Sequence, residues 1–327
     1  MREVVYPQAG LKKPSFYKYL LLTRPDHWFK QIFMLPGVAL ALLLVPHGSL
    51  FHILIAVGAG IISTCCIASA NYVINEWLDA EFDAHHPVKH KRPAATYQLS
   101  SAVVQGEYAV LVLLGLVIAL KISYLFFGVA ILFLLSGLTY NVQPFRTKDK
   151  AYLDVLFEAI NNPIRLLLGW AAVSSFSLPP VSLLFTYWMG GAFLMALKRF
   201  AEYRFVMKSA GMESLVAYRK SFKQYTDNSL LISAFLYALL AAFFLGIFLV
   251  KYRAEYLLTL PLFAILFTSY LRASLKPASK VQTPEKLYKE KSIVLISVVI
   301  VFVLAATTVI DIPFIRNLVT SPIIRLN

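Results

Sequence analysis

Long apolar runs dominate this chain, and they recur at a length that suits a lipid bilayer. A transmembrane helix needs about 20 mostly apolar residues. The first run is short, and the second extends beyond the length that a bilayer requires. The nine candidate runs cover roughly residues 30–46, 52–78, 100–120, 124–140, 152–173, 181–198, 229–250, 255–273 and 292–311. The pattern predicts an all-α polytopic membrane protein with about nine transmembrane helices.

The composition supports a membrane protein over a soluble one. Hydrophobic residues make up 59% of the 327 residues and charged residues only 15%, whereas soluble domains carry about 25% charged residues. The net charge of +14 is typical of nucleic-acid binders too, but the chain has no RNA-binding aromatic motif and no zinc-ligand spacing. Cys65 and Cys66 are adjacent within an apolar run, which indicates core packing and gives no sign of an oxidising compartment.

Lysine and arginine are distributed very unevenly among the predicted loops. With the N-terminus inside, the N-terminal segment and the loops after every second span hold 25 of the 31 basic residues. Basic residues collect in cytoplasmic loops. The pattern therefore predicts an integral membrane protein, of a kind that fits a bacterial inner membrane, with its polar loops and its active site on the cytoplasmic face.

A stripe of acidic and amide side chains ends the second predicted span. Asn75, Asp79 and Asp83 are four residues apart and therefore share one helix face, with Glu76 beside them. Acids at a membrane boundary need compensation, and Mg²⁺ takes oxygen ligands from carboxylates, phosphates and water. The alternative is an ordinary solvated helix end.

Cations follow this stripe within a few residues. Lys89, Lys91 and Arg92 come soon after Asp83. Acids for Mg²⁺ and cations for phosphate oxygens are the two halves of a diphosphate site. The nearby histidines are interpreted as surface residues and not as metal ligands.

A second stripe enters the fifth predicted span. Asp154, Glu158 and Asn162 are again spaced by four, and Arg165 follows in the same helix. Intramembrane polar residues normally face a cavity or one another, and Pro163 is expected to kink the helix. The alternative is a Glu158–Arg165 network that only joins helices.

The sixth predicted span ends in a basic cluster. Lys198, Arg199 and Glu202 are interpreted as phosphate-binding and cavity residues, although basic anchoring at the cytoplasmic face explains the two cations as well. The segment 203–228 mixes aromatic with basic residues, which favours an amphipathic helix that acts as a lid.

The first stripe resembles a known motif. Asn75-Glu76-x-x-Asp79-x-x-x-Asp83 is similar to the first acidic motif of the UbiA superfamily of intramembrane prenyltransferases, with Glu76 where that motif usually has Asp. The resemblance implies a nine-helix bundle around a central cavity. It also implies that a second acidic motif opposes the first and that metal ions bridge one diphosphate between them.

Four further stretches resemble one branch of that superfamily, the decaprenyl-phosphate phosphoribosyltransferases. The segment Asn161-Asn162-Pro163 departs from that branch. The likeness covers most of the chain and implies a single domain over residues 1–327, with loops 79–99, 199–228 and 274–291 as the active-site cap. The four stretches are 86–95, 24–30, 198–202 and 284–288.

The predicted function is a Mg²⁺-dependent transfer of 5-phosphoribosyl from phosphoribosyl diphosphate to a polyprenyl phosphate. One alternative is prenyl transfer from a prenyl diphosphate to an aromatic or lipid acceptor, and another is a membrane transporter. Asp79, Asp83 and Asp154 are the predicted catalytic residues, and they bind Mg²⁺ together with Asn75, Glu76 and Glu158. The predicted phosphate-binding residues are Lys30, Lys89, Arg92, Arg146, Lys148, Lys198 and Arg199, and the other predicted cavity residues are Tyr140, Asn162, Arg165 and Glu202.

Overall fold

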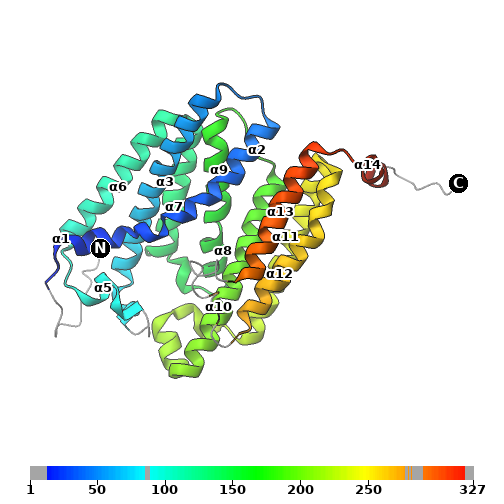
Figure 1. Ribbon diagram of the computed structural model, residues 1–327. Coiled ribbons are helices and arrows are strands. Elements are labelled where there is room, and N and C mark those ends of the chain that lie inside the picture. The colour runs from blue at the N-terminus through cyan, green and yellow to red at the C-terminus, as the bar shows by residue number, and fades with distance from the viewer. Residues whose placement is uncertain (1–12, 85–88, 277–278, 280, 282–289, 321–327) are drawn as a thin grey trace. The chain divides into compact units, whose positions relative to one another are not determined.

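The computed structural model of the chain is helical throughout the part that it describes (Figure 1). That part comprises residues 13–84, 89–276, 279, 281 and 290–320. Eight of its helical segments are long and apolar enough to cross a membrane. These observations confirm the predicted all-α polytopic membrane fold.

The eight candidate spans each overlap one of the predicted runs. The remaining predicted run, 152–173, forms two shorter helices, α8 (Leu153–Ala159) and α9 (Asn161–Val173). Pro163 has no N–H to donate to the carbonyl of Ala159, so α8 ends there. The eight spans are Phe16–Leu44, Leu50–Leu78, Ser101–Ile122, Tyr124–Asn141, Val181–Ser209, Asp227–Tyr252, Ala254–Ser274 and Lys291–Val309.

The chain divides into two compact units. The first unit comprises Met1–Pro179 and Val206–Tyr225, and the second comprises Pro180–Phe205 and Thr226–Asn327. The long helix α10 (Val181–Tyr218) contributes to both units, and it contains a non-helical residue, Gly211, at φ 77°. The predicted single domain with a three-loop cap stays a prediction.

The first unit is a helical bundle built around α3 (Leu50–Leu78). This helix packs against α6 (Ser101–Ile122), α7 (Tyr124–Asn141) and α9. The other elements of this unit are α1 (Phe16–Leu20), η1 (Leu21–Thr23), η2 (Pro25–Met34), α2 (Leu35–Leu44), α4 (Ala80–Ala84), η3 (Lys89–Lys91), α5 (Pro93–Thr96), η4 (Thr147–Asp149), α8 and η5 (Lys220–Gln224), where η denotes a 3₁₀ helix.

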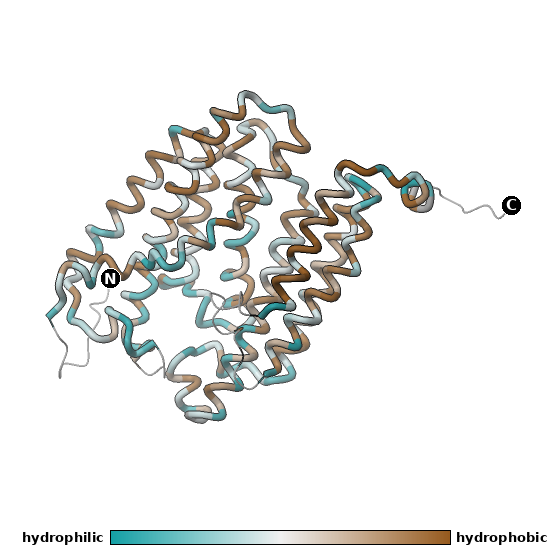
Figure 2. Tube along the Cα trace, in the orientation of Figure 1, coloured by the Kyte–Doolittle hydropathy of each residue, from teal (hydrophilic) through white to brown (hydrophobic). Residues whose placement is uncertain are grey.

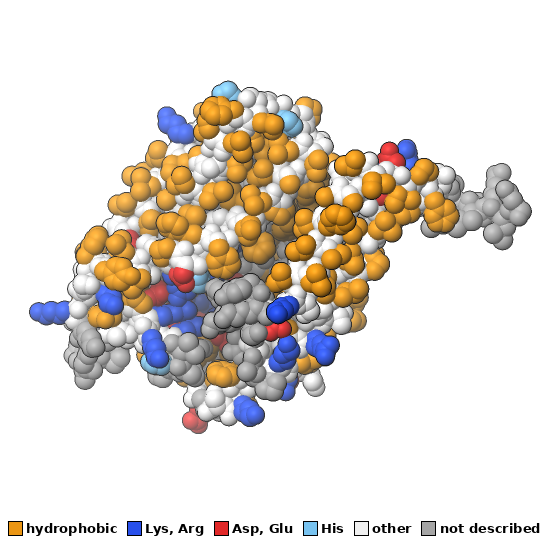
Figure 3. All heavy atoms as spheres, in the orientation of Figure 1, with side chains coloured by type: hydrophobic (Ala, Val, Ile, Leu, Met, Phe, Trp, Pro, Cys, Tyr) orange, Lys and Arg blue, Asp and Glu red, His pale blue; other side chains and the backbone are white. Residues whose placement is uncertain are grey.

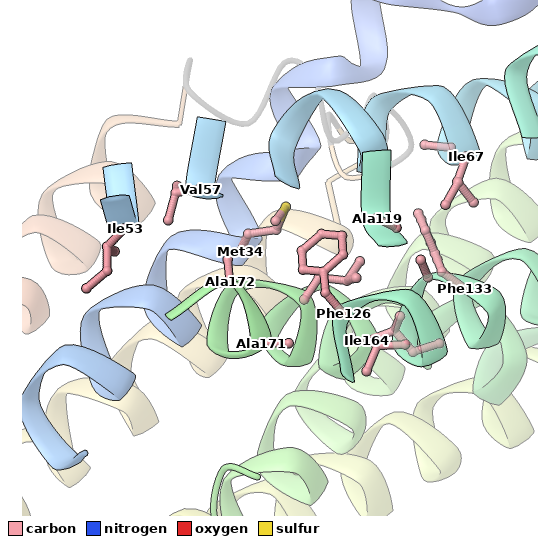
Figure 4. Packing of buried hydrophobic residues seen from close by; sticks show 14 residues of the cluster. Met34, Ile53, Val57, Ile67, Ala119, Phe126, Phe133, Ile164, Ala171 and Ala172 are labelled. Atoms are coloured by element: carbon pink, nitrogen blue, oxygen red, sulfur yellow. The ribbon is translucent and has the colours of Figure 1, made fainter. Parts of the chain in front are cut away.

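Buried apolar side chains from these helices form two clusters, one of which includes Met34, Phe126 and Ile164 and the other Leu22, Val73 and Trp77. Figure 4 shows Met34, Phe126 and Ile164 beside one another, with Ala171 also in the cluster. The helices also carry apolar side chains on the faces that point away from the buried clusters. Leu113, for example, is 64% exposed, as expected for a side chain that faces lipid.

Two glycines bring the segment η2–α2 very close to α9. A Cβ atom added at Gly169 would lie 1.9 Å from the carbonyl oxygen of Met34, and one added at Gly37 would lie 2.0 Å from that of Leu166. Only glycine permits such an approach, which is common between membrane helices. The contact fixes η2 against the start of α9, where Arg165 lies.

The second unit is a bundle of apolar helices joined by aromatic contacts. The rings of Phe193 and Phe267 stack with their centroids 4.7 Å apart, and those of Phe185 and Phe244 lie 4.8 Å apart. This unit contains the first part of α10, followed by α11 (Asp227–Tyr252), η6 (Ala254–Thr259), α12 (Leu260–Ser274), α13 (Lys291–Val309) and α14 (Pro313–Thr320).

Polar residues gather at one end of the bundle in the first unit. The tube in Figure 2 is mostly brown along α3, α6 and α7, and teal segments concentrate around α5 and α8. In Figure 3, apolar side chains cover most of the visible helix surface. The candidate site lies at the polar end.

Candidate active site

The candidate site is built from residues of the first unit, and four of its acids, Glu76, Asp79, Asp83 and Asp154, each have a basic partner. At the end of α3, Glu76 is 1% exposed. Its carboxylate forms an ion pair with Arg24 at 3.1 Å and accepts a 3.5 Å hydrogen bond from the Ala94 amide. A buried carboxylate is stable only when it is paired in this way.

Asp79 lies one turn beyond Asn75 and receives two cations from the loop between α7 and α8. Its Oδ1 accepts hydrogen bonds from Lys148 Nζ at 2.6 Å and from Arg146 Nη2 at 2.9 Å. Asn75 donates to Oδ2 at 3.3 Å. Lys148 and Asn75 both also donate to Asn141 Oδ1, so the first stripe and this loop share one hydrogen-bond network.

Opposing effects set the protonation of Asp79 and Lys148, which lie outside the membrane-spanning helices. Burial favours the neutral form of Asp79, but the charges of Lys148 and Arg146 outweigh it and hold the pKa below its ordinary value. Burial lowers the pKa of Lys148 to about 8, although Asp79 opposes this change. Asp79 is therefore an anion at neutral pH, and Lys148 is a cation that is easily neutralised.

Asp83 forms an ion pair with a residue of the loop that follows it. Asp83 is 3% exposed and pairs with Arg92, whose Nη1 donates to Oδ2. Lys89 donates to the hydroxyl of Tyr218. Arg92 and Lys89 follow Asp83 closely in the sequence, and the structure brings Arg92 back onto the stripe.

Asp154, at the start of α8, is completely buried under the segment 219–225. Tyr225 donates to its Oδ1 at 2.6 Å, and Ser221 donates to its Oδ2 at 3.0 Å. Arg219 Nη1 lies 3.5 Å from Oδ2. Three side chains from one segment therefore cover this carboxylate, and the lid role of 203–228 stays a prediction.

Arg219 connects the two acidic stripes. It pairs with Asp154 on α8, and its charge also contributes to the lowered pKa of Asp79. Its Nη1 donates to the hydroxyl of Tyr140 at 3.3 Å. Asp79 and Asp154, which are 75 positions apart in the sequence, thus face a common cation.

Backbone strain accompanies these ion pairs. Among the described residues, the non-glycine residues with positive φ are Arg24 (49°), Arg146 (29°) and Tyr152 (64°). Arg24 and Arg146 pair with Glu76 and Asp79, and the Tyr152 amide donates to the hydroxyl of Tyr225 at 2.5 Å. Such conformations are costly and persist where the surrounding contacts enforce them.

The second stripe continues from Asp154 along α8 and into α9, in the C-terminal direction. Glu158 accepts from Tyr140 at 3.1 Å, and Asn161 accepts from Ser136 at 2.9 Å. Arg165 donates to Gln31 and to the Asn161 carbonyl, and it forms no ion pair with a carboxylate among the described residues. Glu158 and Arg165 are therefore linked through Asn161, and the alternative of a network that joins helices stays open. The side chain of Asn162 makes no hydrogen bond within the described part of the chain.

The predicted metal ligands have the chemistry that Mg²⁺ requires, since all of them present carboxylate or amide oxygens. Within the described residues, no three acids, histidines or cysteines lie close enough together to hold a metal ion as they stand. A cation of the chain stands beside each of Glu76, Asp79, Asp83 and Asp154. These carboxylate and amide oxygens fit Mg²⁺, provided that phosphate oxygens of the substrate replace them as the partners of the basic side chains.

The remaining predicted residues lie apart from this cluster or in the second unit. Lys30 contacts His27 Nδ1 at 3.0 Å and lies over the ring of Tyr72. In the second unit, Arg199 is 1% exposed and pairs with Glu202 at 3.1 Å. The phosphate-binding roles of Lys198 and Arg199 stay predictions, and the stretches 85–88 and 284–288 lie outside the described residues.

Four site residues were missed by the sequence analysis: Arg24, Arg219, Ser221 and Tyr225. Arg24 lies 52 positions from its partner Glu76, and the other three lie 65 to 71 positions from Asp154. No local spacing connects such pairs. The mixture of aromatic and basic residues in 203–228 was the one available signal.

A polytopic helical fold with paired acidic stripes at one end defines a class of membrane-embedded enzymes. Residues 32–298 match the model of the UbiA prenyltransferase family, and the chain belongs to that family.

Solved structures agree on the fold. A UbiA homologue from Archaeoglobus fulgidus bound to GPP and Mg²⁺ superposes with a TM-score of 0.66 at 20% identity. The match covers 90% of this chain and 100% of that chain. At this identity the likeness concerns the fold alone.

Among curated relatives, decaprenyl-phosphate phosphoribosyltransferases stand out. The one from Mycolicibacterium smegmatis is 26% identical over 232 residues, which are 70% of this chain and 69% of the relative. The one from Mycobacterium tuberculosis is 27% identical over 209 residues, which are 63% of this chain and 65% of the relative. The chain thus spans about two thirds of the length of these relatives.

Proposed function

We propose that this UbiA-family transferase moves 5-phosphoribosyl from phosphoribosyl diphosphate to a polyprenyl phosphate, with Mg²⁺ as cofactor. The observation that carries the proposal is the pairing of Asp79 with Lys148 and Arg146. Carboxylates and cations in direct contact are the two components that a Mg²⁺-diphosphate complex needs, and each is already oriented toward the other.

Asp79, Asp83 and Asp154 would hold the metal, with Asn75 and Glu158 as further oxygen ligands from the two stripes. Bound Mg²⁺ supplies positive charge that stabilises diphosphate as it departs. Arg24 remains the ion-pair partner of Glu76, which favours an orienting role for Glu76 over direct metal contact.

The cations of the chain bind the phosphate oxygens. Lys148 and Arg146 are nearly buried, at 4% and 8% exposed, and a charge-assisted hydrogen bond is strong in such a place. Arg92 reaches the same stripe through Asp83. Together they bind and orient the diphosphate, while Lys30 and Lys89 are candidates for the acceptor phosphate.

The reaction needs no strong base. The acceptor phosphate is already an anion, so its oxygen forms the new bond to ribose C1 as the bond between C1 and the diphosphate oxygen breaks. The electron pair of the broken bond leaves with diphosphate. Segment 219–225 lies over Asp154 and excludes water, which protects the donor from hydrolysis.

The choice of phosphoribosyl as the transferred group is supported by the named relatives and by the sequence stretches that resemble them. The alternative, prenyl transfer from a prenyl diphosphate to an aromatic or lipid acceptor, is supported by the family and by the solved homologues bound to GPP and DMAPP. A transporter is disfavoured because the acids cluster at one end of the helices. We place the site on the cytoplasmic face of a bacterial inner membrane on the strength of the basic loops.

Purified protein with Mg²⁺ and a polyprenyl phosphate tests the proposal. We expect label from ribose-labelled phosphoribosyl diphosphate to enter the lipid fraction. Label from a prenyl diphosphate appearing on a new acceptor, with no ribose incorporation, would establish the alternative instead.

A further inference from the structure

Arg165 is a buried cation in α9, which packs against α2, α3 and α7 of the first unit. It is 7% exposed, and its hydrogen-bond partners within the described residues are an amide and a carbonyl and not a carboxylate. Its Nε donates to Gln31 Oε1 at 2.9 Å, its Nη1 donates to the Asn161 carbonyl at 3.1 Å, and its guanidinium lies 5.0 Å from the ring centre of Phe133. Nη2 donates no hydrogen bond within the described residues. A buried charge without a counter-ion is costly, so an anion is the missing component.

Gln31 provides a second, independent sign of a ligand. It is 2% exposed, and its Nε2 has no hydrogen-bond acceptor in the described part of the chain. Its Oε1 holds the guanidinium of Arg165, so the free amide N–H groups lie beside that guanidinium. The buried Gln31 amide without an acceptor, beside the Arg165 guanidinium, is complementary to a group that offers several oxygens.

The position of Arg165 relative to Asp154 sets the size of the ligand. The polar stripe runs along α8 and α9 through Asp154, Glu158, Asn161 and Arg165. The Arg165 side chain reaches back to the carbonyl of Asn161, which is seven residues after Asp154. At 1.5 Å per residue, the guanidinium lies about 10 Å below Asp154 along the helix axis.

We propose that Arg165 and Gln31 bind the 5-phosphate of phosphoribosyl diphosphate, at the opposite end of the donor from the diphosphate. This inference rests on the proposed function and specifies how its donor is recognised. A sugar with a phosphate at each end spans roughly the distance between the acids and Arg165. A prenyl chain would instead meet a guanidinium and an amide at this depth, which is unfavourable for a hydrocarbon.

The contrasting explanation is that Arg165 and Gln31 only join α9 to η2. The substitution Gln31→Glu separates the two explanations, because it keeps the shape of the side chain and gives Arg165 an internal counter-ion. A purely structural pair would be as stable or more stable, and ligand binding would not change. A phosphate site would lose its ligand, because the new carboxylate occupies and neutralises the guanidinium.

The test measures binding of ribose 5-phosphate to the full-length protein in detergent by calorimetry, without metal. We expect binding to the wild type, and a dissociation constant at least about tenfold higher in both Gln31→Glu and Arg165→Met, in line with the loss of a charge-assisted contact. Gln105→Glu is the matched control, because Gln105 is exposed on α6 and bonds only Ser101. Thermal unfolding shows whether each variant is folded.

Binding that persists in Gln31→Glu and Arg165→Met, or that is absent from the wild type, would overturn the inference while leaving ribosyl transfer possible. Conversely, binding that depends on Arg165 in a protein that incorporates no ribose label would retain the phosphate site and reject the proposed function. A second readout uses ribosyl diphosphate that lacks the 5-phosphate. The wild type should prefer the complete donor, and Arg165→Met should discriminate much less between the two donors.

Discussion

At the scale of single residues, the site depends on carboxylates that are ionised and held in place. Asp79 accepts hydrogen bonds from Lys148 and Arg146, and Asp83 pairs with Arg92. An amide of the same size keeps the hydrogen-bonding shape but removes the charge that a divalent metal needs. Such a substitution should therefore lower the reaction rate more than it lowers the stability of the protein.

Asp79→Asn and Asp83→Asn should each lower kcat by at least about 10²-fold, as expected when one charged group is removed from a preorganised site. Label transfer into lipid is the measurement. Glu81→Gln is the matched control, because Glu81 lies between the two aspartates and is exposed. Normal rates in both aspartate variants would contradict the metal site.

Lys148 should give the reaction an alkaline limit. Burial lowers its pKa to about 8, so its positive charge is present below pH 8 and disappears as the pH rises through that value. Since kcat/KM reports ionisations of the free enzyme, kcat/KM should fall about tenfold per pH unit above pH 8. Lys148→Arg keeps its positive charge over this whole pH range, so the decrease in kcat/KM above pH 8 should disappear in that variant. A decrease that persists would assign the ionisation to another group.

At the scale of elements, the close approach of η2–α2 to α9 positions Gln31 against Arg165. Gly169 and Gly37 permit this approach. Both lie within a few residues of the proposed phosphate-binding pair, so the packing of these helices and the geometry of that pair depend on each other.

Gly169→Ala should therefore destabilise the protein by about 1–3 kcal/mol, the usual cost of overpacking. The added methyl group meets the Met34 carbonyl and must push η2 away. Gly128→Ala is the matched control on α7, where a Cβ meets nothing within 4 Å, and helix propensity alone should make that variant neutral or slightly more stable. Thermal unfolding in detergent compares them, and equal shifts would mean that the approach is not tight.

The sequence predicted those elements whose signals are local. Apolar runs identified the spans, and a spacing of four placed Asn75, Asp79 and Asp83 on one face of the chain. The break between α8 and α9 was foreseen only as a kink at Pro163. The partners Arg24 and Arg219 were beyond prediction, because tertiary packing and not spacing brings them to Glu76 and Asp154.

At the scale of the whole molecule, the basic loops predict which way the protein sits in the membrane. Single cysteines at Lys91 and at Gly48, introduced after replacement of Cys65 and Cys66, test this orientation. Both positions are exposed, Lys91 in η3 and Gly48 between α2 and α3. A membrane-impermeant maleimide should label Lys91→Cys only in inverted vesicles and Gly48→Cys only in right-side-out vesicles. The reverse pattern would move the site to the outer face.

The pairing of acids with bases in the candidate site has a consequence for the order in which reactants arrive. A bare metal ion would have to displace Lys148, Arg146 and Arg219, and the ion pairs that these cations form with Asp79 and Asp154 would be lost. Diphosphate alone would meet the carboxylates. When Mg²⁺ and diphosphate arrive as one complex, Mg²⁺ pairs with the carboxylates and diphosphate pairs with the basic side chains. Every charge then stays compensated. Mg²⁺ should therefore bind at least about tenfold more tightly when diphosphate is present than in its absence, which calorimetry can measure; equal affinities would show that the internal ion pairs offer no barrier to the metal.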